Sequence, residues 1–196
     1  MKTGAVIVAA GLSSRMGDFK PLMAYGGTTI ARHVVRLVRN SGADPVVMVT
    51  GYRAEELEAH LADTGILFVR NEQYGDTQMF DSVKLGISAV VSACDRILLL
   101  PVDTPGICEK TFQQVLAIDS DMVRTMYGGR PGHPILLRSC IAEELCSYEG
   151  EGGLRGAMEH SGFLITDLYV DDRGVNWDVD TQDEYRELIR WKEDRI

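Results

Sequence analysis

The sequence predicts an α/β fold of the Rossmann-like type, with three α/β/α layers and a mainly parallel, mixed central sheet. Apolar, β-branched runs recur along the chain and alternate with stretches whose apolar residues follow a helical period. The runs are continuous, which is typical of strands covered on both faces. No repeat, low-complexity tract or linker interrupts the pattern, so we expect a single domain over residues 1–196.

In the first half of the chain, strand and helix patterns follow one another in order. A buried strand is expected over 4–10, and a helix over 28–41 whose apolar stripe ends near Gly42. The other elements predicted here are a strand at 45–50, an acidic surface helix at 53–63, a strand at 66–69 and a helix at 79–93.

The second half continues the alternation. A fully buried strand over 97–100 is stopped by Pro101, which cannot continue a central strand. The elements predicted after it are a helix at 107–117, strands near 121–127 and 133–138, a helix at 139–147, a strand at 163–170 and a helix at 181–193. The glycine-rich stretches 128–132 and 150–156 are expected to be active-site loops.

The most informative segment is the loop that follows the first strand. Its small residues let the backbone approach a ligand closely, and its cations Arg15 and Lys20 are suited to phosphate oxygens. The spacing of Gly11 and Gly17 fits neither a P-loop nor the dinucleotide fingerprint. The loop is predicted to bind a nucleotide through Ala9, Ala10, Gly11, Ser13, Arg15, Gly17 and Lys20.

A carboxylate follows the buried strand at 97–100. Asp103 is a hard oxygen ligand of the kind that Mg²⁺ prefers, although residues 103–106 are also good turn formers. Ligands of parallel sheets bind outside the carboxyl ends of the strands. Gly11 and Asp103 both lie just past a strand end, so we expect one crevice to hold both.

These residues resemble the nucleotidyltransferases that activate a phosphorylated substrate with an NTP. The family signature is an apolar strand, Ala-Ala-Gly or Gly-Gly, then x-Ser-x-Arg-Met-Gly-x-x-Lys, and residues 6–20 meet every position. Further similarity lies in residues 100–105, 132–134 and 178–181. Ala-Ala-Gly in place of Gly-Gly makes the chain most similar to the molybdenum cofactor cytidylyltransferase-like branch. The implied fold is that of the nucleotide-diphospho-sugar transferases.

The resemblance implies a reaction and its catalytic groups. A nucleoside monophosphate would pass from an NTP, CTP in this branch, to a molybdopterin-type phosphate, with release of pyrophosphate. Arg15, Lys20 and Asp103 would be the catalytic residues. Mg²⁺ would bind Asp103 and a second carboxylate, for which we favour Asp180 over Asp178, although Asp180 also precedes a helix that it could cap.

The substrate contacts implied by the resemblance are less specific. His133 and Arg130 would contact the acceptor, although a structural histidine and a solvated arginine are adequate alternatives. Asn71 and Ser82 would contact the base and ribose, unless they serve only loop and helix-cap chemistry. The family's Gly-Met-x-x-Ser pattern is replaced by the sequence at 77–82, which leaves the choice of base open.

Composition limits the partners. With 20 Lys and Arg against 29 Asp and Glu, the net charge of −9 disfavours nucleic-acid binding. No apolar run has transmembrane length, no signal peptide is recognised, and four cysteines without CxxC spacing indicate a reduced, cytoplasmic protein. The expected partners are the NTP and a phosphorylated small-molecule acceptor, and a molybdoenzyme or its chaperone is a further candidate.

Two alternatives to this function remain open at the level of sequence. One is transfer to a sugar or alcohol phosphate. The other is a nucleotide-binding regulatory module without turnover, which the presence of Asp103 and Asp180 together with Lys20 disfavours, because a pure binder has less need of two metal carboxylates.

Overall fold

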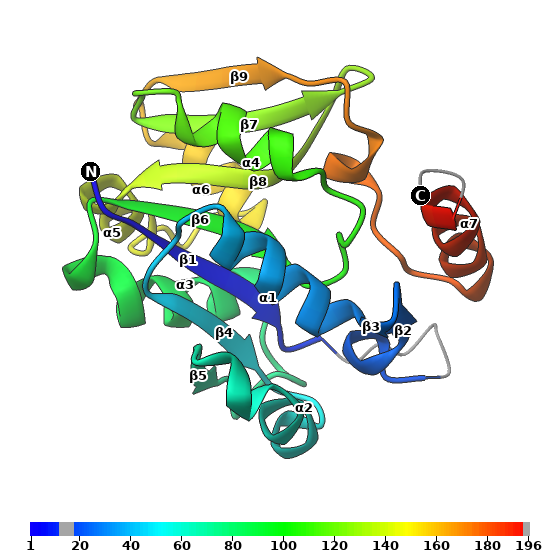
Figure 1. Ribbon diagram of the computed structural model, residues 1–196. Coiled ribbons are helices and arrows are strands. Elements are labelled where there is room, and N and C mark those ends of the chain that lie inside the picture. The colour runs from blue at the N-terminus through cyan, green and yellow to red at the C-terminus, as the bar shows by residue number, and fades with distance from the viewer. Residues whose placement is uncertain (12–17, 194–196) are drawn as a thin grey trace.

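A seven-stranded sheet is the centre of the structure, a computed structural model that describes residues 1–11 and 18–193 (Figure 1). The strand order is β5-β4-β1-β6-β8-β7-β9. The strands are β1 (Thr3–Ala9), β4 (Val46–Thr50), β5 (Leu67–Arg70), β6 (Arg96–Pro101), β7 (Met122–Tyr127), β8 (Arg130–Arg138) and β9 (Ile165–Tyr169). Strand β8 runs antiparallel to its neighbours β6 and β7, whereas the other pairings are parallel. The predicted mainly parallel, mixed sheet is therefore confirmed.

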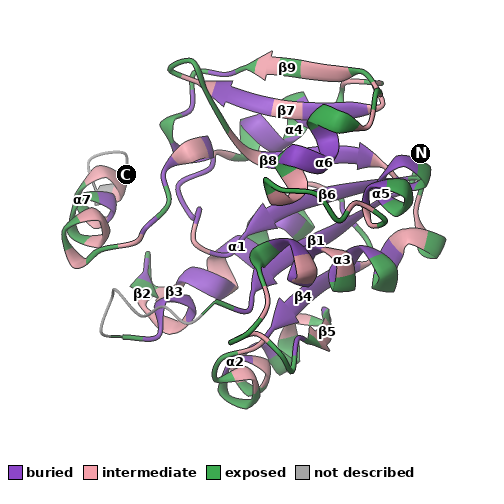
Figure 2. Cartoon of the chain, turned by 180° about the vertical axis from the view of Figure 1, so that it is seen from behind, coloured by how far each residue is buried: buried purple, intermediate pink, exposed green. Residues whose placement is uncertain are grey.

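Helices cover both faces of the sheet, which gives the predicted three layers. One face carries α1 (Ile30–Asn40), α2 (Ala54–Leu61) and α4 (Glu109–Leu116), and the other carries α3 (Met79–Val90), α5 (Ser139–Leu145) and α6 (Gly153–His160). Alternate residues of β1 enter opposite cores: Ile7 packs on the first set of helices and Val6 on the second. Figure 2 shows β1 buried along its length. None of the described helices is long and apolar enough to cross a membrane.

A small third core lies beside the sheet. It joins the hairpin of β2 (Ala24–Tyr25) and β3 (Thr28–Thr29) to helix α7 (Gln182–Glu193). Its buried residues are Tyr25, Ile30, Trp177, Val179 and Leu188. Trp177 packs edge to face on Trp191, with the ring centroids 5.7 Å apart. This core holds the C-terminal segment against the region that follows the first loop.

Three of the sequence predictions are corrected by the structure. Residues 28–29 form β3 rather than the start of the helix expected at 28–41, and the Thr29 hydroxyl accepts a hydrogen bond from the N–H of Arg32 as the N-cap of α1. The stretch 150–156, expected to be a loop, leads into α6, which starts at Gly153. Glycines disfavour a helix by propensity, but burial of Ala157 and Met158 supports this one. Residues 130–132 likewise belong to β8 and not to a loop.

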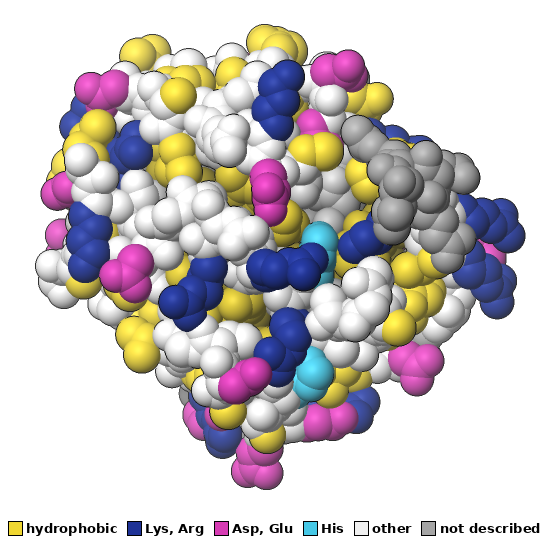
Figure 3. Space-filling model, viewed as in Figure 1, with side chains coloured by type: hydrophobic (Ala, Val, Ile, Leu, Met, Phe, Trp, Pro, Cys, Tyr) yellow, Lys and Arg dark blue, Asp and Glu magenta, His cyan; other side chains and the backbone are white. Residues whose placement is uncertain are grey.

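Charged side chains are mixed on the face that α1 covers. Lys and Arg gather over α1 at the centre of this view, with Asp and Glu between and around them (Figure 3). This face is therefore not the broad basic surface on which nucleic-acid binding depends.

Close packing of α3 on the sheet yields a stability prediction. A Cβ built at Gly86 would lie 2.3 Å from Cγ1 of Val6 and 2.9 Å from Cγ2 of Val49. Overpacking costs about 1–3 kcal/mol, and the better helix propensity of alanine offsets about 1 kcal/mol at most. We expect Gly86→Ala to lower the free energy of unfolding by about 1–2 kcal/mol in urea denaturation. Gly75→Ala, which meets open space, is the matched control and should change little; an equal effect of the two would contradict this packing.

Candidate active site

The centre of the candidate site is the ammonium group of Lys20, which lies between two carboxylates. Its Nζ is 2.9 Å from Oδ2 of Asp103 and 2.9 Å from Oδ1 of Asp180. The Lys20 side chain is only 9% exposed. Residues from three distant parts of the chain therefore meet at one point, as the prediction of a common crevice requires.

The electrostatics of this cluster favour the charged form of Lys20 and disfavour the charged form of Asp178. Burial lowers the pKa of Lys20, but the two carboxylates outweigh it, and the net pKa is raised above its usual value. The pKa of Asp178 is raised to about 6, by desolvation first and then by repulsion from Asp103 and Asp180, although its side chain still reaches solvent. Asp180, rather than Asp178, makes the direct contact with Lys20.

Backbone contacts bring the two carboxylates together. The N–H of Val179 donates to the carbonyl of Asp103, 3.2 Å away. One oxygen of Glu184, at the start of α7, accepts from the N–H groups of Asp180 and Thr181 at 2.9 and 2.8 Å. These bonds fix the position of the Asp180 side chain relative to the end of β6.

The segment before Asp180 packs tightly on the loop after Asp103. A Cβ at Gly174 would lie 2.2 Å from the carbonyl of Gly106, so only glycine allows this approach. The buried carboxylate of Asp172 accepts from the Cys108 N–H at 2.8 Å and from the Thr111 hydroxyl at 2.5 Å. Close packing and hydrogen bonds therefore hold the two loops together.

A pocket of about 170 Å³ opens beside Lys20. Among the predicted nucleotide contacts, its walls include Ala9, Ala10, Gly11, Lys20, Ser82 and Asp103. Gly11 and Asp103 thus line the same pocket, and the predicted crevice is confirmed. Ser13, Arg15 and Gly17 lie outside the described residues.

Asn71 supports this pocket without lining it. Its buried Nδ2 donates to Oγ of Ser82 at 3.0 Å and to Oγ1 of Thr77 at 2.9 Å. The structure thus brings Asn71 and Ser82 together, with Ser82 at the wall and Asn71 behind it. Contact of either residue with a base or ribose stays a prediction.

A second pocket of about 420 Å³ adjoins the first. The two share the wall residues Val8, Gln78, Met79 and Pro101. The second pocket is mostly apolar, and its floor includes Phe80, Val83, Leu99, Ile135 and Met158. A molecule bound in it would therefore reach the first pocket at one end.

His133 lines the second pocket because β8 is antiparallel. The start of β8 lies at the sheet edge where the parallel strands end, so His133 comes close to Asp103. Desolvation lowers the pKa of His133 to about 4, partly opposed by Asp103 and by the carbonyl of Leu99. The ring is neutral at pH 7, and its buried Nδ1 has no hydrogen-bond partner among the described residues.

The arginines of this region differ in their position relative to the second pocket. Arg130 is exposed at the start of β8 and lines neither pocket, and its contact with the acceptor stays a prediction. Arg124 and Arg155 line the second pocket instead. Sequence reasoning missed Arg124, although a charged residue within the apolar strand pattern at 121–127 is a signal that could have revealed it.

The fold and site geometry define a class of protein. A small-residue strand end, a lysine held by two carboxylates and a second pocket joined to the first are the features expected of a nucleotidyltransferase. The chain belongs to the family of MobA-like NTP transferase domains, whose model matches residues 5–164. The resemblance drawn from the motifs is thus confirmed, and the protein is a nucleotidyltransferase.

Individual relatives agree with this assignment. The chain is 27% identical to the molybdenum cofactor cytidylyltransferase of Escherichia coli K12 over 185 residues, which is 92% of each chain. The crystal structure of Rv0371c from Mycobacterium tuberculosis H37Rv matches with a TM-score of 0.84 and 26% identity, covering 97% of this chain and 98% of that one. A manganese complex of that protein matches with a TM-score of 0.81 and 25% identity, over 97% and 99% of the two chains.

The position of Lys20 yields a prediction on nucleotide binding. Lys20→Met keeps the apolar stem and removes the charge that would meet phosphate oxygens. A charged hydrogen bond contributes about 1.5–3 kcal/mol, so we expect Kd for the NTP to rise at least about tenfold in isothermal titration calorimetry. Lys110→Met, on the exposed surface of α4, is the matched control. An unchanged Kd in Lys20→Met would mean that the phosphates bind elsewhere.

Proposed function

We propose that the protein transfers the cytidylyl group of CTP to the phosphate of a molybdopterin-type acceptor and releases pyrophosphate. The observation that carries this proposal is the apolar second pocket joined to the nucleotide pocket. A flat heterocycle with a phosphate fits such a pocket better than a sugar or alcohol phosphate, whose hydroxyl groups would lack partners on the apolar walls. The similarity to the cytidylyltransferase of Escherichia coli supports the same choice.

In this proposal the protein aligns two reactants and balances charge. A phosphate oxygen of the acceptor attacks the α-phosphorus of CTP, and pyrophosphate leaves. Lys20 would leave its carboxylates in part and donate to the phosphates, together with Arg15. The neutral ring of His133 would contact the acceptor at the end of its pocket next to Asp103.

The donor atoms at Asp103 and Asp180 suit a hard divalent cation. Two carboxylate oxygens already hold one cation, the Lys20 ammonium, at 2.9 Å each. Mg²⁺ prefers one or two carboxylates together with phosphates and waters, so this set fits it. When bound, Mg²⁺ would supply neutralisation of the charge that develops on the triphosphate.

We also propose a cytoplasmic reaction. All four cysteines are free, as expected in a reducing compartment. The cytidylylated product would then pass to a molybdoenzyme or its chaperone.

The test of the proposed function is a screen of CTP, GTP, ATP and UTP against molybdopterin, a hexose phosphate and glycerol phosphate. Pyrophosphate release with CTP and molybdopterin is the expected result. Release only with a sugar or alcohol phosphate would overturn the proposed acceptor.

The metal assignment predicts that Asp103→Asn retains the fold but loses Mg²⁺-dependent turnover. The substitution preserves the shape of the side chain and removes the charge that would hold the cation. Asp180→Asn should lose turnover as well, whereas Asp183→Asn, on the exposed side of α7, should not. Turnover of Asp103→Asn equal to that of the parent at matched Mg²⁺ would contradict this role.

The choice of base yields a further prediction. Ala9 and Ala10 are each 4% exposed and line the proposed nucleotide pocket, where the methyl group of Ala10, on the face of α3, would narrow the space for a base. Discrimination by a clash of this size is about 1–3 kcal/mol, so CTP should be preferred over GTP only in part. Ala10→Gly should weaken the preference. The measurement is kcat/KM for the four nucleotides with one acceptor, and a clear preference for GTP or ATP would refute the cytidylyl assignment.

A further inference from the structure

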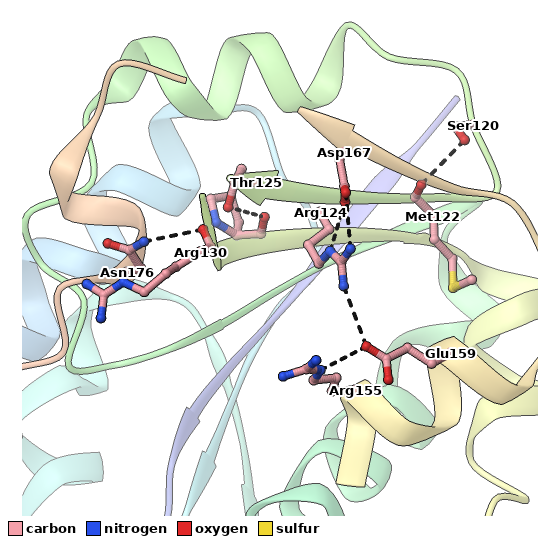
Figure 4. Close-up of polar contacts among 10 residues, drawn as sticks. Ser120, Met122, Arg124, Thr125, Arg130, Arg155, Glu159, Asp167 and Asn176 are labelled. Carbon is pink, nitrogen blue, oxygen red and sulfur yellow. Dashed lines mark hydrogen bonds and ion pairs between the residues drawn. The ribbon is translucent and has the colours of Figure 1, made fainter. Parts of the chain in front are cut away.

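Arg124 is held by a two-point ion pair at the wall of the second pocket. Strands β7 and β9 pair so that Arg124 lies opposite Asp167. Nε of Arg124 donates to Oδ1 at 2.8 Å and Nη2 donates to Oδ2 at 3.1 Å (Figure 4). This pairing uses two of the three guanidinium nitrogens and fixes the plane of the group.

The third guanidinium nitrogen of Arg124, Nη1, does not bond to Asp167. Nη1 of Arg124 lies 3.9 Å from Oε1 of Glu159, beyond hydrogen-bond distance. That oxygen already accepts from Nε of Arg155 at 2.8 Å, as Figure 4 shows. Within residues 1–11 and 18–193, Nη1 therefore makes no hydrogen bond, although the Arg124 side chain is only 20% exposed.

The strand geometry turns Arg124 toward the pocket rather than toward solvent. Side chains two residues apart share a face of a strand, and Met122 belongs to the core under α3, α5 and α6. Arg124 follows on that face, and the pairing of β7 with β8 shifts register immediately after it. Such irregularities redirect side chains. Arg124 lines the second pocket but is not part of the wall shared with the nucleotide pocket.

We propose that Arg124 determines acceptor specificity by donating from Nη1 to a hydrogen-bond-accepting edge of the acceptor, at the part of the pocket away from Lys20 and Asp103. The acceptor class is a phosphorylated heterocycle with a ring carbonyl or ring nitrogen at the end opposite its phosphate. Asp167 is the positioning residue that orients Arg124. This inference rests on the proposed function in one respect, that the acceptor occupies the second pocket.

A structural role alone would explain the ion pair of Arg124 with Asp167 across two strands. It does not require Arg124 to line a mostly apolar pocket beside the candidate site, with an Nη1 group that the two bonds to Asp167 do not use. The two interpretations predict different effects of substituting Arg124. If its role is structural, the substitution lowers stability; if it determines specificity, the substitution changes KM for the acceptor and leaves KM for CTP unchanged.

The test uses the full chain with CTP and molybdopterin, followed by pyrophosphate release. Arg124→Met keeps the apolar stem and removes the donors, and KM for the acceptor should rise about tenfold or more while KM for CTP stays the same. Asp167→Asn should raise the acceptor KM less, and it should add nothing in the double variant, because it acts through Arg124. Arg138→Met is the matched control: Arg138 also pairs with aspartates but lines neither pocket.

Binding of 6-hydroxymethylpterin, which has the heterocycle without a phosphate, gives a second readout through its fluorescence. Arg124→Met should weaken pterin binding. The affinity of Arg124→Lys should lie between those of the parent and Arg124→Met, because lysine keeps the charge but not the planar, forked guanidinium. If Arg124→Met does not fold, the lysine variant carries the test. An acceptor KM and a pterin affinity equal to those of the parent, or an equal rise in both KM values, would overturn the proposal.

Failure of the proposed function is recognisable separately. If the parent protein shows no turnover with CTP and molybdopterin, the proposed acceptor is wrong. Pterin binding then tests the role of Arg124. Loss of pterin binding in Arg124→Met supports that role, and absence of pterin binding from both the parent and the variant overturns it.

Discussion

The ammonium of Lys20 between Asp103 and Asp180 is the contact on which the arrangement of the site depends. A charge this deeply buried is costly unless it is paired, so its carboxylates must stay in place. The contacts join residues that are 83 and 160 positions apart in the sequence. Two other features keep these segments together. The third core packs Trp177 and Val179 near the segment that carries Lys20, and the N–H of Val179 bonds to the carbonyl of Asp103.

The direction of β8 provides the second constraint. An all-parallel sheet would place only strand ends at the reactive edge, whereas antiparallel β8 brings its beginning there, with His133. The second pocket thus takes its lining from β6, β7 and β8 together with α3 and α6. One reversed strand therefore adds His133 to the edge of the sheet where the parallel strands end.

The two pockets differ in the chemistry of the side chains that line them. Lys20 and Asp103 line the first pocket, mostly apolar side chains line the second, and the wall that the two pockets share carries no charged side chain. Among the residues that line the second pocket, Arg124 differs because its two bonds to Asp167 leave its Nη1 group unused. Under the proposed function, orientation of the acceptor and the charge balance of the reaction would depend on different residues.

Much of the fold was predictable because burial dictates local pattern. The apolar runs at 4–10, 45–50 and 97–100 match β1, β4 and β6 to within a residue or two, and the common crevice of Gly11 and Asp103 follows from the polarity of parallel strands. Helix α6 was missed because the glycines at its start lower the helix propensity of the sequence. Packing of Ala157 and Met158 in the core supports the helix instead. Strand β3 was missed because a two-residue strand has no periodicity to detect.

By itself, then, the sequence determined the fold class, the nucleotidyltransferase family and the residue types of the site, because strand burial and the loop signature are local properties. The tertiary structure alone decided which residues meet. Asp180, rather than Asp178, contacts Lys20, Asn71 supports Ser82 from behind, and Arg124 rather than Arg130 lines the second pocket. These choices depend on strand register, on the reversal of β8 and on close approach of distant loops, and such contacts leave no periodic trace along the chain.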